Sequence, residues 1–168
     1  MRRTERYKIE GANSLWHVYN TVSFLKVMKC FIFIQIGRFT PFMAMKNWLY
    51  RTFLRMDIGE KASLALMVMP DTMFPERISI GANSIIGFNT TILAHEYLID
   101  EYRLGDVKIG SNVMVGANST ILPGVEIGDG AIVSAATLVH KDVPAGSMVG
   151  GNPMRIIFTA EEMAARKK

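Results

Sequence analysis

The chain of 168 residues holds one side chain whose type and position suggest acid–base catalysis. His95 ends a regular six-residue pattern and opens a charged stretch that contains Glu96, Asp100, Glu101 and Arg103. An imidazole exchanges a proton near neutral pH, and a carboxylate or a backbone carbonyl on its other nitrogen fixes the tautomer. The position therefore indicates that His95 is a general base, and it leaves open which group orients the ring.

A catalytic metal is the first alternative, because some β-helix enzymes hold zinc with three histidines. The chain has two further histidines, His17 and His140, and both lie far from His95 along the sequence. The stretch after His95 offers no second histidine and no cysteine. We expect no metal, and a metal-dependent β-helix hydratase remains a minor alternative.

The element that must position His95 is a six-residue repeat. Most units begin with Ile, Val or Leu, continue with a small residue, and carry a small or β-branched residue in fifth place. The units are IGEKAS from Ile58, LALMVM from Leu64, IGANSI, IGFNTT and ILAHEY from Ile80, and IGSNVM, VGANST, ILPGVE, IGDGAI, VSAATL and VHKDVP from Ile109.

This period predicts a β-solenoid. A helix would repeat near 3.6 residues and a simple meander near 2. When a short strand bends after each unit, one aliphatic side chain points inward and stacks on its neighbours in adjacent coils. Each buried side chain is worth roughly 1.5–3 kcal/mol, so the aliphatic column can hold the fold.

The repeat fails in two places. Ile92 and Ile109 are 17 residues apart, one short of three units, and residues 95–106 are charged and aromatic. We expect a loop there that leaves the solenoid, and a second irregular coil over residues 70–79. Loops on a rigid scaffold often carry function.

The two ends of the chain differ from the repeat. Residues 1–57 contain 10 Lys and Arg against 3 Asp and Glu, whereas residues 58–168 contain 9 against 12. One or two helices are expected over residues 15–55, joined near residues 37–41. Their apolar, basic sequence fits either a peripheral contact with anionic lipid or a cap packed on the first coil or on a neighbouring subunit.

A capping box, Thr159 with Glu162, predicts a short helix within residues 158–168 that would cover the open end of the aliphatic column. The positive charge lies outside the repeat, which argues against a nucleic-acid partner. One cysteine excludes an internal disulfide and fits a reducing compartment. No secretory signal or spanning helix is evident, so the expected location is the cytoplasm, with contact at the inner membrane face as an option.

The repeats resemble the hexapeptide-repeat acyltransferases, and in particular the maltose and galactoside O-acetyltransferases and polysaccharide-modifying acetyltransferases. The resemblance covers residues 58–157 and is most specific in the His95 loop, the Lys-Asp-Val-Pro turn at Lys141 and the Gly-Asn-Pro-Met-Arg ending at Arg155. It implies that the solenoid is a left-handed parallel β-helix of triangular section. The expected fold is therefore an all-β solenoid of this kind, with the N-terminal helical segment and the short C-terminal helix that the sequence itself predicts. The resemblance also implies a homotrimer with acetyl-CoA bound between subunits.

The resemblance further implies roles for single residues. His95 matches the general base that takes a proton from an acceptor hydroxyl. Ala117 and Ala135 match positions whose backbone groups hold the pantetheine arm. Lys141 and Arg155 match basic positions near the nucleotide phosphates.

Four departures from the family pattern bear on the substrate. Met114 stands where a Trp often packs at the coenzyme cleft, His140 replaces a Thr, and Phe158 replaces a basic residue. An Asn that helps sugar acetyltransferases to bind the acceptor has no counterpart in residues 64–69. The expected reaction is CoA-dependent O-acetylation of a sugar or saccharide-like acceptor. N-acetylation of an amino sugar and a non-catalytic β-helix used for assembly remain alternatives.

Overall fold

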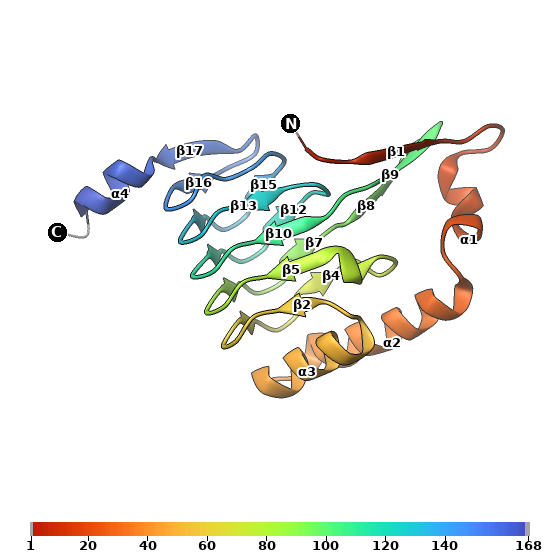
Figure 1. The fold of residues 1–168 in the computed structure, drawn as a ribbon, viewed down its shortest axis with the longest axis horizontal. Helices are drawn as coiled ribbons and strands as arrows, with labels where there is room; N and C mark the ends of the chain where they lie inside the picture. The colour runs from red at the N-terminus through yellow and green to blue at the C-terminus, as the bar shows by residue number, and fades with distance from the viewer. Residues whose placement is uncertain (1, 167–168) are drawn as a thin grey trace.

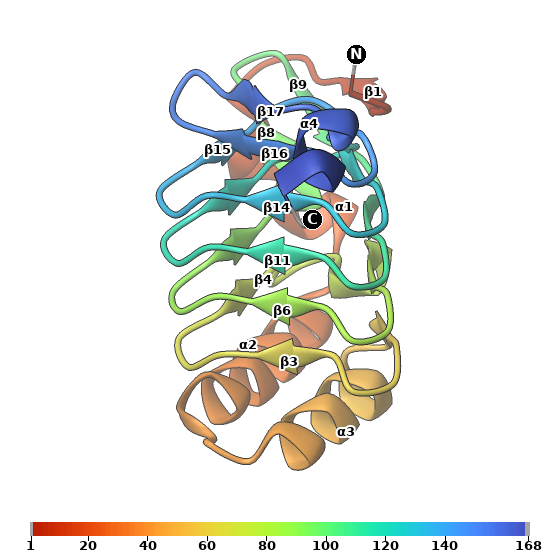
Figure 2. The same cartoon turned by 90° about the vertical axis from the view of Figure 1, so that its left-hand side faces the viewer.

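The computed structural model describes residues 2–166 and shows a stack of three-sided coils (Figures 1 and 2). Three sheets, parallel but for one terminal strand, form the sides. The first contains β2 (Asp57–Ile58), β5 (Ile78–Ile80), β10 (Val107–Ile109) and β13 (Glu126–Ile127). The second contains β3 (Ser63–Leu64), β6 (Ile85–Ile86), β11 (Met114–Val115), β14 (Ile132–Val133), β16 (Met148–Gly150) and the antiparallel β17 (Arg155–Phe158). The third contains β4 (Met69–Pro70), β7 (Thr91–Ile92), β12 (Thr120–Ile121) and β15 (Leu138–Val139).

The first residue of each repeat points inward, as the period predicts. Ile80 pairs with Ile109 and Ile109 with Ile127 along one sheet, and Ile92 pairs with Ile121 along another. All five are at most 3% exposed. The predicted aliphatic column is therefore confirmed, and it forms the core of the molecule.

The base of the column is closed by helices α2 (Phe24–Phe39) and α3 (Met43–Phe53), which lie beneath the first coil (Figure 2). α3 supplies hydrogen-bond donors to carbonyls of that coil. Lys46 Nζ donates to the carbonyls of Leu64 and Ala65 at 2.8 and 2.9 Å, and Asn47 donates to that of Ala62 at 2.7 Å. These donors protect a sheet edge that would otherwise offer unpaired carbonyls.

The stretch over residues 95–106 leaves the solenoid, and it does so as a β-hairpin. Strand β8 (His95–Tyr97) pairs with β9 (Glu101–Leu104), and β9 pairs antiparallel with the N-terminal strand β1 (Glu5–Lys8). The rings of Tyr7 and Tyr102 stack across β1 and β9 with centroids 4.7 Å apart. The hairpin is stable outside the solenoid because a strand from the far end of the chain pairs with it.

The remaining elements are short. The 3₁₀ turn η1 (Ser14–His17) and helix α1 (Val18–Thr21) connect β1 to α2, and η2 (Pro75–Arg77) lies in the irregular coil. No helix within residues 2–166 is long and apolar enough to cross a bilayer.

Helix α4 (Ala160–Arg166) begins at the predicted capping box. The Thr159 amide donates to Glu162 Oε2 at 2.7 Å, and the Glu162 amide donates to Thr159 Oγ1 at 3.3 Å. The expectation that this helix covers the aliphatic column is wrong, because α4 projects away from the coils and buries none of its residues (Figure 1). Met154, which is 3% exposed, joins the core near that end instead.

Candidate active site

The side chain of His95 is oriented by Asp71, a residue outside the six-residue repeat and not among the candidates that the sequence suggests. His95 Nδ1 lies 2.6 Å from Asp71 Oδ2. Strand β4 pairs with β7 so that Pro70 stands beside Ile92, and this register places Asp71 next to the start of the hairpin one coil further on. The irregular coil over residues 70–79 thus carries the partner of the histidine.

The carboxylate of Asp71 is held by hydrogen bonds on both oxygens. Oδ1 accepts from the amides of Met73 and Phe74, both at 2.8 Å, and Oδ2 accepts from those of Ala94 at 2.7 Å and His95 at 3.1 Å. Its side chain is fully buried, which opposes ionisation. The hydrogen bonds and the nearby imidazole outweigh that burial, so the pKa of Asp71 lies below its ordinary value.

An ionised carboxylate only accepts hydrogen bonds, so the imidazole of His95 carries its proton on Nδ1. Nε2 is then left with its lone pair. The His95 side chain is 16% exposed and lies between the rings of Phe74 and Tyr97, with centroids 5.9 and 5.2 Å away. The site therefore offers a half-buried base flanked by two aromatic rings.

The acidic residues of the hairpin have other partners. Glu96 Oε1 accepts from Arg2 at 2.6 Å, and Glu101 pairs with Arg103 and with Arg6. Asp100 is exposed at the hairpin turn. The charges next to His95 in sequence therefore fasten the hairpin to the N-terminal strand and do not orient the imidazole.

The N-terminal segment reaches the site through Tyr97. The hydroxyls of Tyr97 and Thr21 lie 2.5 Å apart, which ties α1 to the strand that begins with His95. Nothing in the spacing of residues 1–57 pointed to this contact, because it depends on where the segment folds back.

The positions matched to coenzyme binding fall on more than one corner of the coil. Ala117 and Ala135 lie in adjacent coils at the corner after β11 and β14, where the amide of Ala136 donates to the carbonyl of Ala117 at 2.8 Å. Met114 is 44% exposed on the outer side of β11. His95 stands at the next corner, after β7, so the third sheet separates it from both alanines.

The two basic positions are both exposed. Lys141 follows β15 and lies above His95 on the same corner, because β15, β12 and β7 are neighbours in one sheet. Arg155 begins β17 at the top of the second sheet. One chain alone therefore does not gather His95, the alanines and the basic residues into one cleft.

Comparison with known proteins decides the family. The "Putative acetyltransferase YvoF" of Bacillus subtilis (strain 168) is 73% identical over 168 residues, which cover 100% of this chain and 98% of the relative. The chain belongs to the hexapeptide-repeat acetyltransferase family. The family model described as bacterial transferase hexapeptide (six repeats) matches residues 106–141, within the regular coils.

Solved structures of this family share the fold. The hexapeptide-repeat acetyltransferase VCA0836 of Vibrio cholerae O1 biovar eltor, complexed with acetyl-coenzyme A, superposes with a TM-score of 0.68 and 22% identity over 81% of this chain and 87% of that one. A galactoside acetyltransferase in complex with coenzyme A superposes with a TM-score of 0.63 and 22% identity over 81% of each chain. The predicted left-handed β-helix with terminal helices is confirmed.

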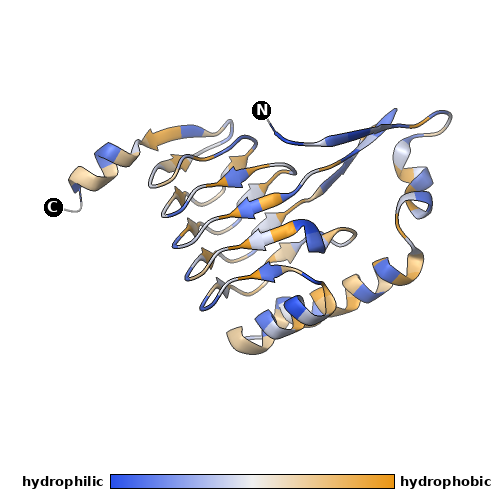
Figure 3. Cartoon of the chain, in the orientation of Figure 1, coloured by the Kyte–Doolittle hydropathy of each residue, from blue (hydrophilic) through white to orange (hydrophobic). Residues whose placement is uncertain are grey.

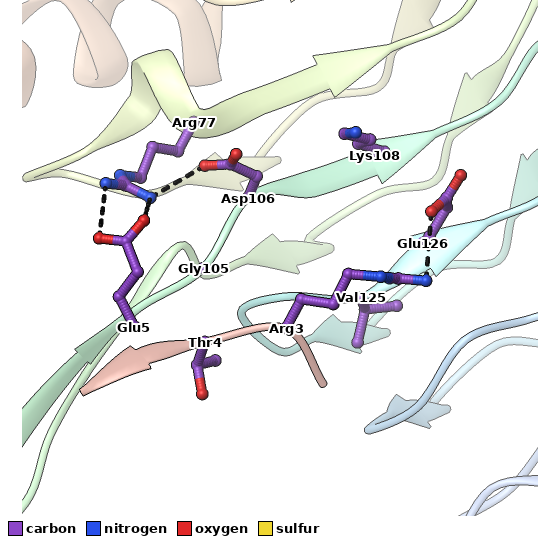
Figure 4. A pocket seen from close by; sticks show the side chains of 9 residues that line it. All are labelled: Arg3, Thr4, Glu5, Arg77, Gly105, Asp106, Lys108, Val125 and Glu126. Carbon is purple, nitrogen blue, oxygen red and sulfur yellow. Dashed lines mark hydrogen bonds and ion pairs between the residues drawn. The ribbon is translucent and has the colours of Figure 1, made fainter. Parts of the chain in front are cut away.

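A hollow of about 370 Å³ lies elsewhere, between β1 and the outer side of the first sheet (Figure 4). Arg77 bridges Glu5 and Asp106 there, and Arg3 pairs with Glu126. Neither His95 nor any matched coenzyme position lines it. The ion pairs across this hollow hold the N-terminal strand on the solenoid, away from the catalytic candidate.

The other two histidines, His17 and His140, lie in other segments of the chain. His140 Nδ1 lies 3.2 Å from the carbonyl of Leu138, and His17 belongs to η1. Among residues 2–166 no three His, Cys, Asp or Glu side chains are grouped so as to hold a metal ion.

Proposed function

We propose that this protein transfers an acetyl group from acetyl-CoA to a hydroxyl of a sugar or saccharide-like acceptor, with His95 as the general base. The observation that carries the proposal is the buried Asp71 carboxylate on His95 Nδ1, which leaves Nε2 as a base on a side chain that is 16% exposed. A β-helix used only for assembly needs the aliphatic column, but it has no use for a buried carboxylate–imidazole pair.

The chemistry follows from this arrangement. His95 Nε2 takes the proton of the acceptor hydroxyl while that oxygen attacks the thioester carbonyl of acetyl-CoA. The C–S bond then breaks, the acetyl group stays on the acceptor oxygen, and the departing thiolate receives the proton from His95. Asp71 keeps the ring in the required tautomer and stabilises the imidazolium that forms between the two proton transfers.

The coenzyme would lie along the corner that carries Ala117 and Ala135, with Met114 beside it and Lys141 and Arg155 near the phosphates. Small residues at a corner let an extended chain approach the backbone closely. Acetyl-coenzyme A and coenzyme A are bound in the two related structures named above. The separation of this corner from His95 within one chain supports a homotrimer, in which the His95 corner of one subunit faces the alanine corner of its neighbour.

The acceptor would contact the rings of Phe74 and Tyr97, which flank His95. The stretch over residues 64–69, LALMVM, offers it no polar side chain. Orientation of a sugar would therefore rely on polar groups outside that stretch. The galactoside acetyltransferase shares the fold, and the proposed saccharide class rests on the family and on these two rings.

The proposal is tested with the purified full chain, acetyl-CoA and a panel of saccharides and amino sugars. Acceptor-dependent release of free thiol gives the rate, and mass analysis of the product distinguishes an ester from an amide. We expect His95→Ala to lower turnover by about 10²–10⁴-fold while coenzyme binding is retained. Turnover of the His95→Ala variant at the wild-type rate would remove His95 from the mechanism, and failure of the wild type to bind CoA would favour an assembly role.

A further inference from the structure

The N-terminal helices carry an apolar surface that the described part of the chain leaves open. Leu25 and Trp16 are 79% and 80% exposed. Figure 3 shows hydrophobic residues over most of α2. We call this surface the basal face, and it comprises the exposed residues Leu15, Trp16, Tyr19, Phe24, Leu25, Met28, Phe31, Ile32, Ile36, Phe39, Phe42, Met43, Met45 and Trp48.

On α2, the basal face is distinct from the side that packs on the solenoid. That side packs on the base of the solenoid through Cys30, Ile34 and Gly37, which are buried. Phe24, Met28, Phe31, Ile32 and Phe39 follow the spacing of one helical face and point away from the coils. α2 is thus apolar on both sides, although only one side is needed to close the column.

The segment that carries the basal face has charge of one sign, and two carboxylates of the first coils border it. Glu60 lines a hollow with Met43 and Arg51, and Glu76 lies beside Lys26. Residues 11–56 contain six Lys and Arg and no Asp or Glu. Lys46 is buried and Lys26 pairs with Glu76 at 2.6 Å. The other four, at positions 29, 38, 51 and 55, are at least partly exposed.

We propose that the basal face docks on the surface of an anionic lipid bilayer. Apolar and aromatic side chains bordered by cations, with no acidic residue among them, fit the boundary between acyl chains and anionic headgroups. A second copy of the same face would be a poorer partner, because the segment that carries the face supplies cations and no carboxylate. No described helix can cross the bilayer, so the contact is peripheral.

The basal face begins beside the candidate active site. The Lys26 ammonium lies 4.8 Å from the centroid of the Phe74 ring, and that ring contacts the imidazole of His95. Phe24 and Leu25 precede Lys26 at the start of α2. Docking would therefore hold the catalytic corner near the lipid surface, although the docking itself does not depend on the reaction.

The test is flotation of the full chain with vesicles of phosphatidylcholine alone and of phosphatidylcholine with phosphatidylglycerol. The chain has two tryptophans, Trp16 and Trp48, and both belong to the basal face, so their emission should shift to the blue on binding. We expect binding to the anionic vesicles, weaker binding to the neutral ones, and loss of binding as salt increases.

A matched pair of variants separates the basal face from general hydrophobicity. Leu25 is 79% exposed, and Ile156 is 52% exposed but lies on β17, at the other end of the stack of coils (Figure 1). Leu25→Glu should weaken vesicle binding about tenfold, while Ile156→Glu, which adds the same charge, should bind like the wild type. Wild-type protein that stays with neither vesicle, or a Leu25→Glu variant that binds as well as the wild type, would overturn the proposal. The proposal would also be overturned if the wild type bound no vesicles and the Leu25→Glu variant had a lower oligomeric state than the wild type. The basal face would then be an interface between subunits.

Discussion

Asp71 Oδ2 and His95 Nδ1 lie 2.6 Å apart although the two residues are 24 positions apart in the chain. The pair forms because parallel coils stack in register, with Pro70 beside Ile92. The next residues of both strands leave the regular path at the same corner. One departure is the coil that buries Asp71, and the other is the hairpin that begins with His95.

The first prediction concerns the orientation of the imidazole. Asp71→Asn should lower turnover by about 10²–10⁴-fold, because an amide NH₂ opposite Nδ1 favours the tautomer with its proton on Nε2, where the base is needed. The measurement is steady-state kinetics of acceptor-dependent thiol release. Coenzyme affinity should change little, since no matched coenzyme position contacts Asp71.

Glu96→Gln is the control for that variant. Glu96 is adjacent to His95 in sequence but binds Arg2, so its loss removes a carboxylate from the hairpin without touching the ring. Near wild-type turnover is expected. Equal losses in both variants would mean that the general charge of the hairpin, and not the Asp71 contact, supports activity.

The second prediction is a loss of stability in acid that depends on Asp71. The pKa of Asp71 in the folded chain lies below its ordinary value of 3.8. At a pH between the folded and the unfolded value, the unfolded chain therefore binds a proton that the native state does not. The contribution of Asp71 is therefore present above about pH 4 and is lost as the pH falls through the lower folded value. In urea titrations, the free energy of unfolding of Asp71→Asn should lie well below that of the wild type at neutral pH, and the difference should narrow towards pH 3 or below. A difference that stays constant with pH would contradict a lowered pKa for Asp71.

The period of six predicts the coils, their core residues and the position of His95, because each depends on neighbours within one or two turns. The hairpin and Asp71 were harder to foresee. The hairpin depends on β1, which comes from the opposite end of the chain, and Asp71 stands in a coil that lacks the repeat. A signal for Asp71 did exist, since it follows a strand in register with the strand before His95. No signal in the sequence indicated that α4 points away from the coils. Its capping box determines where the helix starts but not its direction.

The third prediction concerns the closure of the column by α3. Lys46→Met keeps a long apolar stem but removes both hydrogen bonds to the carbonyls of Leu64 and Ala65. Burial lowers the pKa of Lys46, so methionine also relieves a desolvation cost. Because orphaned buried carbonyls cost about 1–3 kcal/mol, we expect a net loss of that order in the free energy of unfolding. Denaturant titration measures it, and Lys29→Met, at an exposed position of α2, should stay within about 0.5 kcal/mol of the wild type.

The fourth prediction tests the coenzyme corner. Ala135 is exposed beside Gly116, so a leucine there needs no repacking of the core but would obstruct a pantetheine arm lying along the corner. Ala135→Leu should raise the KM for acetyl-CoA about tenfold, equivalent to about 1.4 kcal/mol, with an unchanged melting temperature. Ala82 offers the matched control. It stands beside Gly59 as Ala135 stands beside Gly116, but at the corner after the first sheet. Ala82→Leu should leave the KM for acetyl-CoA unchanged. If both leucine variants raise the KM equally, the effect belongs to the coil as a whole, and the coenzyme does not lie along the corner of Ala117 and Ala135.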